Sequence, residues 1–508
     1  MTSILVPGTL LTLISVVYLF GVAPDMTWLG LAGDSPDYVA SAVLFQKAGL
    51  GGYPLLIGLG SILEVVLHKG LGFNMYWVMG LLSAISTVAA SAYIYATIRL
   101  YSTKSVLPPI LGTLAYAGSL LVWSQSVIPE VYSITVTFMV IGTYYLLRAY
   151  KQEKPRLLYV SAFAFGLSFC THPLAYFAIL PCLIYVVRVP LSNKPHLLKL
   201  LGIGILGFIP WVQFFVAGDN VSYPGISSDK LMWLLGSFGY LGNLPILPND
   251  ALITRLEDFF PMLGLGLCIL VPSMTLGFKE IYRTEKFSVI LILTILGLPL
   301  LLYLTSRPPQ WITYLLPTIA FLSILGGMCA VKFLEKYQVK ESLVVASVCG
   351  LALLGLNLYS YDIGRSIDPS PTTARQMYDK LDTFPEGTIV FAHSWGHLGL
   401  LVDTHNRFGG SKLIRMDDTS PIETMELALE GTDVVLPPGN TRLYQTPLIE
   451  LEDTVHNNVR QIEELNPNRL VYVTYVKDSS KIQFDYISAS NYRHSLNDVP
   501  QLRQAASR

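Results

Sequence analysis

Charge and cysteine are both scarce in this chain. Charged residues make up 14% of its 508 positions, and the formal net charge is −1. No basic tract is present, which argues against a nucleic-acid partner. The five cysteines fall within apolar stretches and show no CxxC spacing, so neither a disulfide framework nor a zinc site is indicated. These two absences exclude a small disulfide-stapled domain and a nucleic-acid-binding domain.

Apolar residues are correspondingly abundant. Hydrophobic residues make up 52% of the chain and the mean hydropathy is +0.50, as in proteins that cross a membrane many times. A helix needs roughly 17 to 25 apolar residues to span a bilayer. We therefore predict an all-α polytopic membrane protein with about 11 transmembrane helices. The predicted spans are 4–23, 74–98, 107–125, 130–147, 157–171, 173–187, 198–217, 258–278, 287–305, 309–330 and 342–360.

Two apolar segments need separate interpretation. Residues 4–23 have no basic flank and no small-residue cleavage site, so we expect a retained first membrane helix and not a signal peptide. Residues 52–68 are short and contain Glu64, which favours a helix lying at the membrane interface.

The basic residues orient this layout. With a cytoplasmic N-terminus, the inside loops hold 15 of the 20 basic residues before position 361. This bias agrees with the positive-inside rule, whereas a true crossing by 52–68 would reverse it. The layout places the loop that carries Asp34 outside, together with everything after Tyr361.

The chain changes character at about residue 361. Residues 361–508 contain 20 acidic and 14 basic residues and no long apolar run. We predict a transmembrane domain over 1–360 and a small extracytoplasmic soluble α/β domain over 361–508. Expected strands are 388–392, 433–436 and 470–476, and expected helices are 373–381, 422–429 and 448–465.

Polar residues gather at the predicted outer ends of the spans. Because these ends lie at one depth, their side chains can converge on one site although they are far apart in sequence. The candidates are Asp34, Asp37, Tyr53, Glu130, Tyr132, His172 and Arg307.

Two of these residues suit sugar transfer from a lipid-linked phosphate donor. Such a reaction needs a carboxylate that takes the proton of the acceptor hydroxyl and a cation beside the departing phosphate. Asp34 fits the first role and Arg307 the second, because a guanidinium binds phosphate oxygens in a bidentate manner. Structural alternatives remain open: Asp34 and Glu130 as helix caps, Arg307 as a snorkelling residue, and His172 as a turn marker.

The order of five motifs carries a resemblance. GDSPDY (33–38), GYPL (52–55), WSQSVIPEVY (123–132), GLSFCTHPL (166–174) and SRPPQWITYLLP (306–317) follow one another. In this order they resemble the protein O-mannosyltransferase-like family of the GT-C superfamily, which uses polyprenyl-phosphate sugars. The similarity spans roughly residues 5 to 330. It implies that Asp34 is the catalytic base, that Asp37 is a second acid, and that Glu130 and His172 are the acid and histidine of the family pattern.

We therefore expect an inverting membrane glycosyltransferase that moves a hexose, plausibly mannose, from a polyprenyl-phosphate carrier to an acceptor hydroxyl. The resemblance suggests a protein Ser or Thr as acceptor, with a glycan or a lipid as alternatives. Asp37, Tyr53, Glu130, Tyr132 and His172 would bind substrate, and a divalent Mg or Mn ion at Asp34 and Asp37 is an open possibility. The expected location is the plasma membrane or the endoplasmic reticulum. Two other functions stay open: a transporter or lipid-carrier flippase, and a silent relative that binds glycans.

Overall fold

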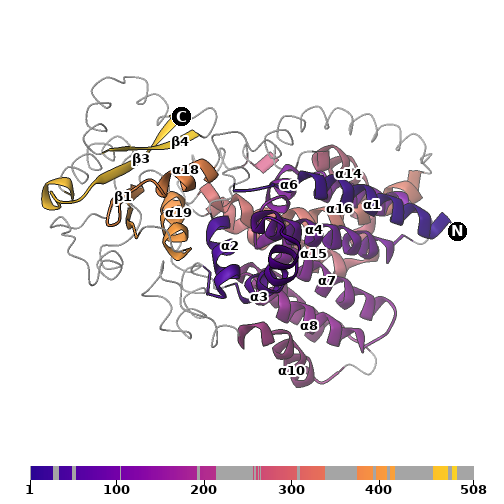
Figure 1. Ribbon diagram of the computed structural model, residues 1–508. Coiled ribbons are helices and arrows are strands. Elements are labelled where there is room, and N and C mark those ends of the chain that lie inside the picture. The colour runs from indigo at the N-terminus through magenta and orange to yellow at the C-terminus, as the bar shows by residue number, and fades with distance from the viewer. Residues whose placement is uncertain are drawn as a thin grey trace.

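A computed structural model gives the architecture of the protein (Figure 1). A helical bundle forms one part, and a smaller part carries a β-sheet. The structure describes residues 2–26, 34–48, 53–102, 105–191, 195–212, 256, 259–260, 263, 265–305, 309–337, 374–392, 396–408, 412–417, 462–478 and 483–488.

Helices occupy ten of the eleven predicted spans, and the eleventh, 342–360, lies outside the described ranges. The bundle contains α1 (Thr2–Gly21), α4 (Met75–Arg99), α5 (Leu107–Ala117), α6 (Leu120–Ser126), α7 (Tyr132–Lys151), α8 (Leu157–Phe169), α9 (Tyr176–Arg188), α10 (Leu197–Gly207), α14 (Leu265–Thr284), α15 (Lys286–Thr305) and α16 (Leu316–Tyr337). Short helices α2 (Ser35–Leu44) and α3 (Pro54–Leu63), and a π-helix (Glu64–Lys69), follow α1.

Length and composition support fewer membrane crossings than the sequence predicts. Among the described residues, three helical segments are long and apolar enough to cross a membrane: Met75–Arg99, Lys286–Leu304 and Ile312–Lys336. A fourth arises if α5 and α6, bent by 63°, form one broken span. The count of 11 therefore stays a prediction.

Small residues bring the helices of the bundle together. Where α8 meets α10, a Cβ on Gly166 would lie 2.1 Å from the Gly204 carbonyl oxygen, and one on Gly207 would lie 2.3 Å from the Phe163 carbonyl oxygen. Only glycine permits so close an approach of two backbones, as is usual for helices packed within a membrane.

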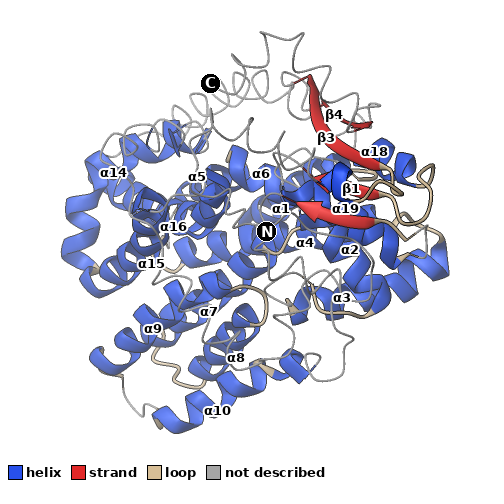
Figure 2. Ribbon diagram, turned by 90° about the vertical axis from the view of Figure 1, so that its left-hand side faces the viewer, coloured by secondary structure: helices blue, strands red, loops and turns tan. Residues whose placement is uncertain are grey.

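The smaller part contains a β-sheet (Figure 2). Its four strands are in the order β2-β1-β3-β4. Strand β1 (Ile389–Ala392) pairs in parallel with β2 (Ile414–Asp417) and β3 (Val471–Asp478), and β4 (Gln483–Ser488) pairs antiparallel with β3. Helices α18 (Ala374–Leu381) and α19 (Gly396–Arg407) accompany the sheet.

The predicted strands at 388–392 and 470–476 and the helix at 373–381 coincide with β1, β3 and α18. The elements expected at 422–429 and 433–436 fall on residues that the structure leaves undescribed, as does most of 448–465. Strands β2 and β4 and helix α19 were not predicted. β2 is only four residues long, with Arg415 and Asp417 at alternate positions. Helix α19 has glycine, a poor helix former, at Gly396 and Gly399 in its first turn.

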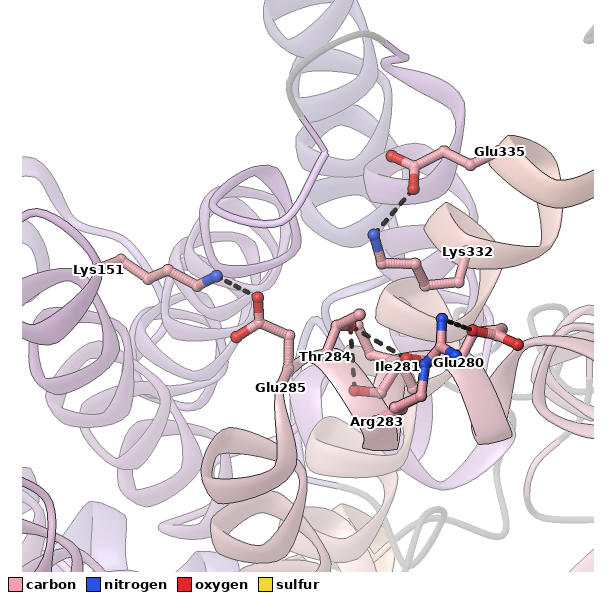
Figure 3. Close-up of polar contacts among 8 residues, drawn as sticks. All are labelled: Lys151, Glu280, Ile281, Arg283, Thr284, Glu285, Lys332 and Glu335. Carbon is pink, nitrogen blue, oxygen red and sulfur yellow. Dashed lines mark hydrogen bonds and ion pairs between the residues drawn. The ribbon is translucent and has the colours of Figure 1, made fainter.

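Charged side chains gather at one end of the bundle (Figure 3). Lys151 at the end of α7 pairs with Glu285 in the α14–α15 turn, Arg283 pairs with Glu280 at 3.1 Å, and Lys332 pairs with Glu335 at 2.8 Å. The positive-inside layout assigns all three of these basic residues to the inner face. The structure brings them to one end of the bundle, and the side of the membrane that this end faces stays a prediction.

Candidate active site

Asp34 stands directly before α2, at the other end of the bundle. It occupies the N-cap position, with Pro36 in the first turn, but its side chain forms no capping hydrogen bond. The Tyr38 hydroxyl donates instead to Asp34 Oδ2 at 3.5 Å, the outer limit for such a bond. The half-buried Asp34 side chain therefore does not cap α2, and the interpretation of Asp34 as a helix cap is removed.

The loop between α6 and α7 is fixed against three other elements and presents Glu130. Three anchors hold it: Ala23 N donates to Val127 O at 2.8 Å, Ser35 Oγ donates to Pro129 O at 2.8 Å, and Ser83 Oγ donates to Glu130 O at 3.0 Å. The Ser35 bond joins this loop directly to the residue after Asp34. The two acidic segments are thus held together by hydrogen bonds and not by sequence proximity.

The Glu130 side chain is only 2% exposed. Its Oε2 accepts a hydrogen bond from Val131 N at 3.2 Å. Burial first, and the nearby charge of Asp34 second, raise the pKa of the Glu130 carboxyl well above its ordinary value. Asp34 and Glu130 therefore form a pair in which Glu130 tends to keep its proton, an arrangement typical of acid–base sites.

His172 lies in the turn between α8 and the short helix Pro173–Ala175. Its Nδ1 accepts a hydrogen bond from Leu174 N at 3.1 Å and so caps that helix. Burial lowers the pKa of His172 from its ordinary 6.5 to about 3, against the opposing effect of the Asp34 charge. The imidazole is thus neutral, with its proton on Nε2, and can donate a hydrogen bond but not act as a cation. His172 is both a turn residue and a neighbour of Asp34.

Tyrosine rings surround His172. Its ring is stacked with Tyr53 at a centroid separation of 5.9 Å and lies 5.1 Å from Tyr132 and 5.5 Å from Tyr314. Tyr38 meets Tyr53 edge-on at 5.4 Å. Five rings from α2, the start of α3, the start of α7, the His172 turn and the helix before α16 therefore converge beside Asp34, and such rings can pack against a sugar.

An apolar groove of about 680 Å³ begins next to this cluster. Pro54, Leu55 and Ile62 of α3 and Val66 of the π-helix line one part of it, and Ile209 lines another. Leu55 N donates to Cys170 O at 3.2 Å, which ties the start of the groove to the His172 turn. Tyr53, just before Pro54, has φ 42° and ψ 56°, a left-handed conformation that is strained for a tyrosine and often found at functional sites.

Asp37 is the predicted site residue with a different environment. Its Oδ1 accepts a hydrogen bond from Arg407 Nη1 of α19 at 2.6 Å, and both side chains are 3% exposed. A metal shared by Asp34 and Asp37 would have to compete with this buried ion pair. Among the described residues, no three His, Cys, Asp or Glu side chains gather closely enough to hold a metal ion.

Arg307 lies outside the described residues. The helical segment Pro309–Leu315 begins two positions later and brings Tyr314 to the ring cluster. Three further residues belong to this region and were not predicted from the sequence: Tyr38, Tyr314 and Arg407. Tyr38 could have been found from its position one helical turn after Asp34, and Tyr314 from its place in the fifth motif.

A known protein family matches the segment that carries most of the predicted site residues. A family model described as Protein O-mannosyl-transferase TMEM260 N-terminal domain matches residues 34–195. The predicted resemblance is confirmed. This segment contains six of the seven predicted site residues, all but Arg307. No curated protein matches the chain.

Two solved proteins share the fold. ArnT from Cupriavidus metallidurans in the apo state has a TM-score of 0.54 at 10% identity, over 95% of this chain and 97% of ArnT. The oligosaccharyltransferase AglB from Archaeoglobus fulgidus, in complex with an inhibitory peptide and a dolichol-phosphate, has a TM-score of 0.54 at 14% identity, over 92% of this chain and 69% of AglB. ArnT bound to undecaprenyl phosphate gives 0.51. The chain therefore shares its overall fold with ArnT and AglB.

Proposed function

We propose that this protein is an inverting membrane glycosyltransferase. It moves a hexose, mannose in the first instance, from a polyprenyl-phosphate carrier to a protein Ser or Thr hydroxyl on the outer or lumenal face. The observation that carries this proposal is the placement of Asp34: a carboxylate that does not cap its helix, close to Glu130 and to five aromatic rings. The structures of ArnT bound to undecaprenyl phosphate and of AglB in complex with a dolichol-phosphate support the class of carrier.

Asp34 is the base in this reaction. Its carboxylate takes the proton of the acceptor hydroxyl while the hydroxyl oxygen forms a bond to the anomeric carbon of the sugar. The bond from that carbon to the phosphate oxygen breaks on the opposite face, and the electron pair leaves with the carrier phosphate. A single displacement of this kind inverts the anomeric configuration. Glu130, which tends to keep its proton, and neutral His172 supply hydrogen bonds to sugar hydroxyls without adding charge.

Two features bind the donor: an apolar groove holds its lipid tail, and Arg307 holds its phosphate. The groove along α3 and the π-helix offers an apolar path that starts at the ring cluster, and it suits the first isoprene units of the carrier. Arg307, in the segment before Tyr314, is the proposed partner of the phosphate. The rings of Tyr53 and Tyr132 stack against the sugar between these two ends.

Turnover by purified protein tests the proposal. Full-length protein in lipid nanodiscs is incubated with a panel of polyprenyl-phosphate sugars and Ser/Thr peptides, with and without Mg²⁺ or Mn²⁺, and release of free carrier phosphate is measured. We expect release from the mannosyl donor that depends on the peptide and fails in Asp34→Asn. Peptides with Ala at every Ser and Thr are the control for the acceptor. Absence of release from every donor, or equal release by Asp34→Asn, would refute the assignment.

A further inference from the structure

The sheet-containing part of the protein is packed directly onto the helix that follows Asp34. Helices α19 and α2 lie side by side in both views (Figures 1 and 2). Tyr38 and Val39 of α2 share one hydrophobic cluster with Leu401 and Val402 of α19, and each of these side chains is at most 2% exposed. The contact therefore has the character of a protein core and not of a loose contact between domains.

Arg407 is the polar centre of this contact. Its guanidinium donates from all three nitrogens: Nη1 to Asp37 Oδ1 at 2.6 Å, Nη2 to Ser41 Oγ at 2.9 Å and Nε to Gln46 Oε1 at 3.0 Å. Asp37 lies in the first turn of α2, Ser41 one turn later, and Gln46 beyond its end. Arg407 is thus hydrogen-bonded to α2 in its first turn, one turn later and just beyond its end.

The hydrogen bonds that hold α2 also fix the position of Asp34, which directly precedes this helix. At the start of α2, Ser35 Oγ donates to the Pro129 carbonyl, and two residues later Asp37 accepts a hydrogen bond from Arg407. Asp34 directly precedes this fixed segment, and the Tyr38 hydroxyl of α2 donates to its carboxylate. A rotation of α2 about its axis would move Asp34 and Asp37 together, and the Arg407 bonds oppose that rotation.

We propose that Arg407 is a positioning residue for sugar transfer, and that Asp37 is its anchor on α2 and not a substrate ligand. This inference rests on the proposed function, because it assigns the sheet-containing part the task of holding Asp34 in its reactive orientation. A guanidinium with three acceptors in fixed directions is suited to that task, whereas a lysine could satisfy only part of the set.

Exposure distinguishes Arg407 from a second arginine at the same contact. Arg375 of α18 reaches Asp25 at 3.8 Å, but its side chain is 47% exposed and it also pairs with Asp379. Exposed pairs of this kind contribute little, because water competes for both partners. Arg375→Gln is therefore the matched control for Arg407→Gln: the same change, on the same part of the protein, at an exposed pair with Asp25 and not at α2.

The test combines kinetics with amide hydrogen exchange on the full chain. In Asp37→Asn and in Arg407→Gln we expect kcat to fall by about 10- to 100-fold, with the donor KM within about twofold of the parent. The double variant should lose no more than the worse single variant, because both remove the same interaction. Arg407→Lys should recover part of kcat, and Arg375→Gln should match the parent.

Amide exchange separates this inference from the proposed function. In Arg407→Gln we expect exchange within residues 35–44 to accelerate by about tenfold or more, and in Arg375→Gln to stay at the parent rate. This readout needs no turnover, so it holds even if no donor is found. Unchanged exchange in Arg407→Gln overturns the inference. So does a raised donor KM in Asp37→Asn with normal kinetics in Arg407→Gln, because Asp37 would then be a substrate ligand.

Discussion

Glu130 and the glutamates at the other end of the helical bundle lie in opposite environments. At the end drawn in Figure 3, each of three glutamates is paired with a lysine or arginine. Those pairs retain contact with water; the Arg283 side chain, for example, is 77% exposed. At the other end, Glu130 is 2% exposed and lies near a second acid, Asp34. Helix α7 alone, with 20 residues, separates the two ends by about 30 Å.

The charges at one end of the bundle therefore indicate membrane topology, whereas those at the other end indicate a reaction site. Paired, partly exposed charges cost little to keep and report where a helix leaves the membrane. A buried acid beside a like charge costs stability, because burial and repulsion both disfavour ionisation. Such an arrangement is expected where a reaction needs it. Substitutions at the Asp34 end should therefore change turnover, and those at the Lys332 end should not.

The largest effect is expected for Asp34→Asn. The amide keeps the size of the side chain but cannot accept a proton, and a general base contributes about 10²–10⁴-fold in rate. We expect turnover to fall by a factor in this range while donor binding and the melting temperature stay at the parent values. Single-turnover assays and thermal melts measure these quantities. Full activity in folded Asp34→Asn would remove Asp34 as the base.

The second-largest loss of turnover is expected for substitutions of Arg307. Removing one group that stabilises developing negative charge typically costs about 10²–10³-fold. We expect a loss of this size in Arg307→Ala and a smaller loss in Arg307→Lys, which keeps the charge but not the bidentate geometry. Donor-dependence curves for the three proteins distinguish a phosphate ligand from a snorkelling residue. Identical curves for Arg307→Ala and the parent would mean that another cation binds the donor phosphate.

Glu130→Gln should change the pH dependence of stability. Because its pKa is raised in the folded protein, Glu130 holds a proton there that it loses in the unfolded chain above its ordinary value of 4.5. Its contribution to stability is therefore complete below that pH and is lost as the pH rises toward the folded-state pKa. Glutamine resembles the protonated acid, so the variant should become progressively more stable than the parent as pH rises. Thermal melts from about pH 5 to about pH 8 measure this.

The sequence was sufficient to find the Asp34 end but not the contact that holds it. Motif order and the positions of helix ends predicted that Glu130 and His172 would approach Asp34, because helices that start and stop at one depth leave few alternatives. The Arg407–Asp37 contact joins residues that are 370 positions apart. It depends on how α19 packs on α2, and nothing in the local pattern around Arg407 specifies that packing. Asp37 therefore resembled a second site acid.

His172→Asn should have a smaller effect on turnover. Asparagine can still cap the helix at Pro173, but it loses the ring contacts with Tyr53 and Tyr132, each worth about 0.5–1.5 kcal/mol. We expect turnover to fall by less than about tenfold at neutral pH. The pH dependence of stability should change in the opposite sense to that of Glu130→Gln.

The folded parent keeps His172 neutral, with a pKa of about 3, whereas the unfolded chain protonates it below about 6.5. Protonation therefore favours unfolding as the pH falls from 6.5 toward 3, and the parent loses stability that His172→Asn retains. Paired melts at about pH 5 and about pH 8 should show the variant gaining on the parent at the lower pH. If the difference in melting temperature between His172→Asn and the parent is the same at both pH values, the His172 side chain is in contact with water.

The smallest effect is expected at the charged end, in Lys332→Gln. Lys332 and Glu335 are one turn apart on α16, with side chains 25% and 50% exposed. Exposed pairs of this kind contribute about 0–1 kcal/mol. The melting temperature and turnover should therefore stay close to those of the parent. Together with Asp34→Asn, this variant tests the contrast between the two ends with one neutralised charge at each. A large loss of turnover in Lys332→Gln would mean that the charged end influences the reaction about 30 Å away, and the separation of topology from chemistry would fail.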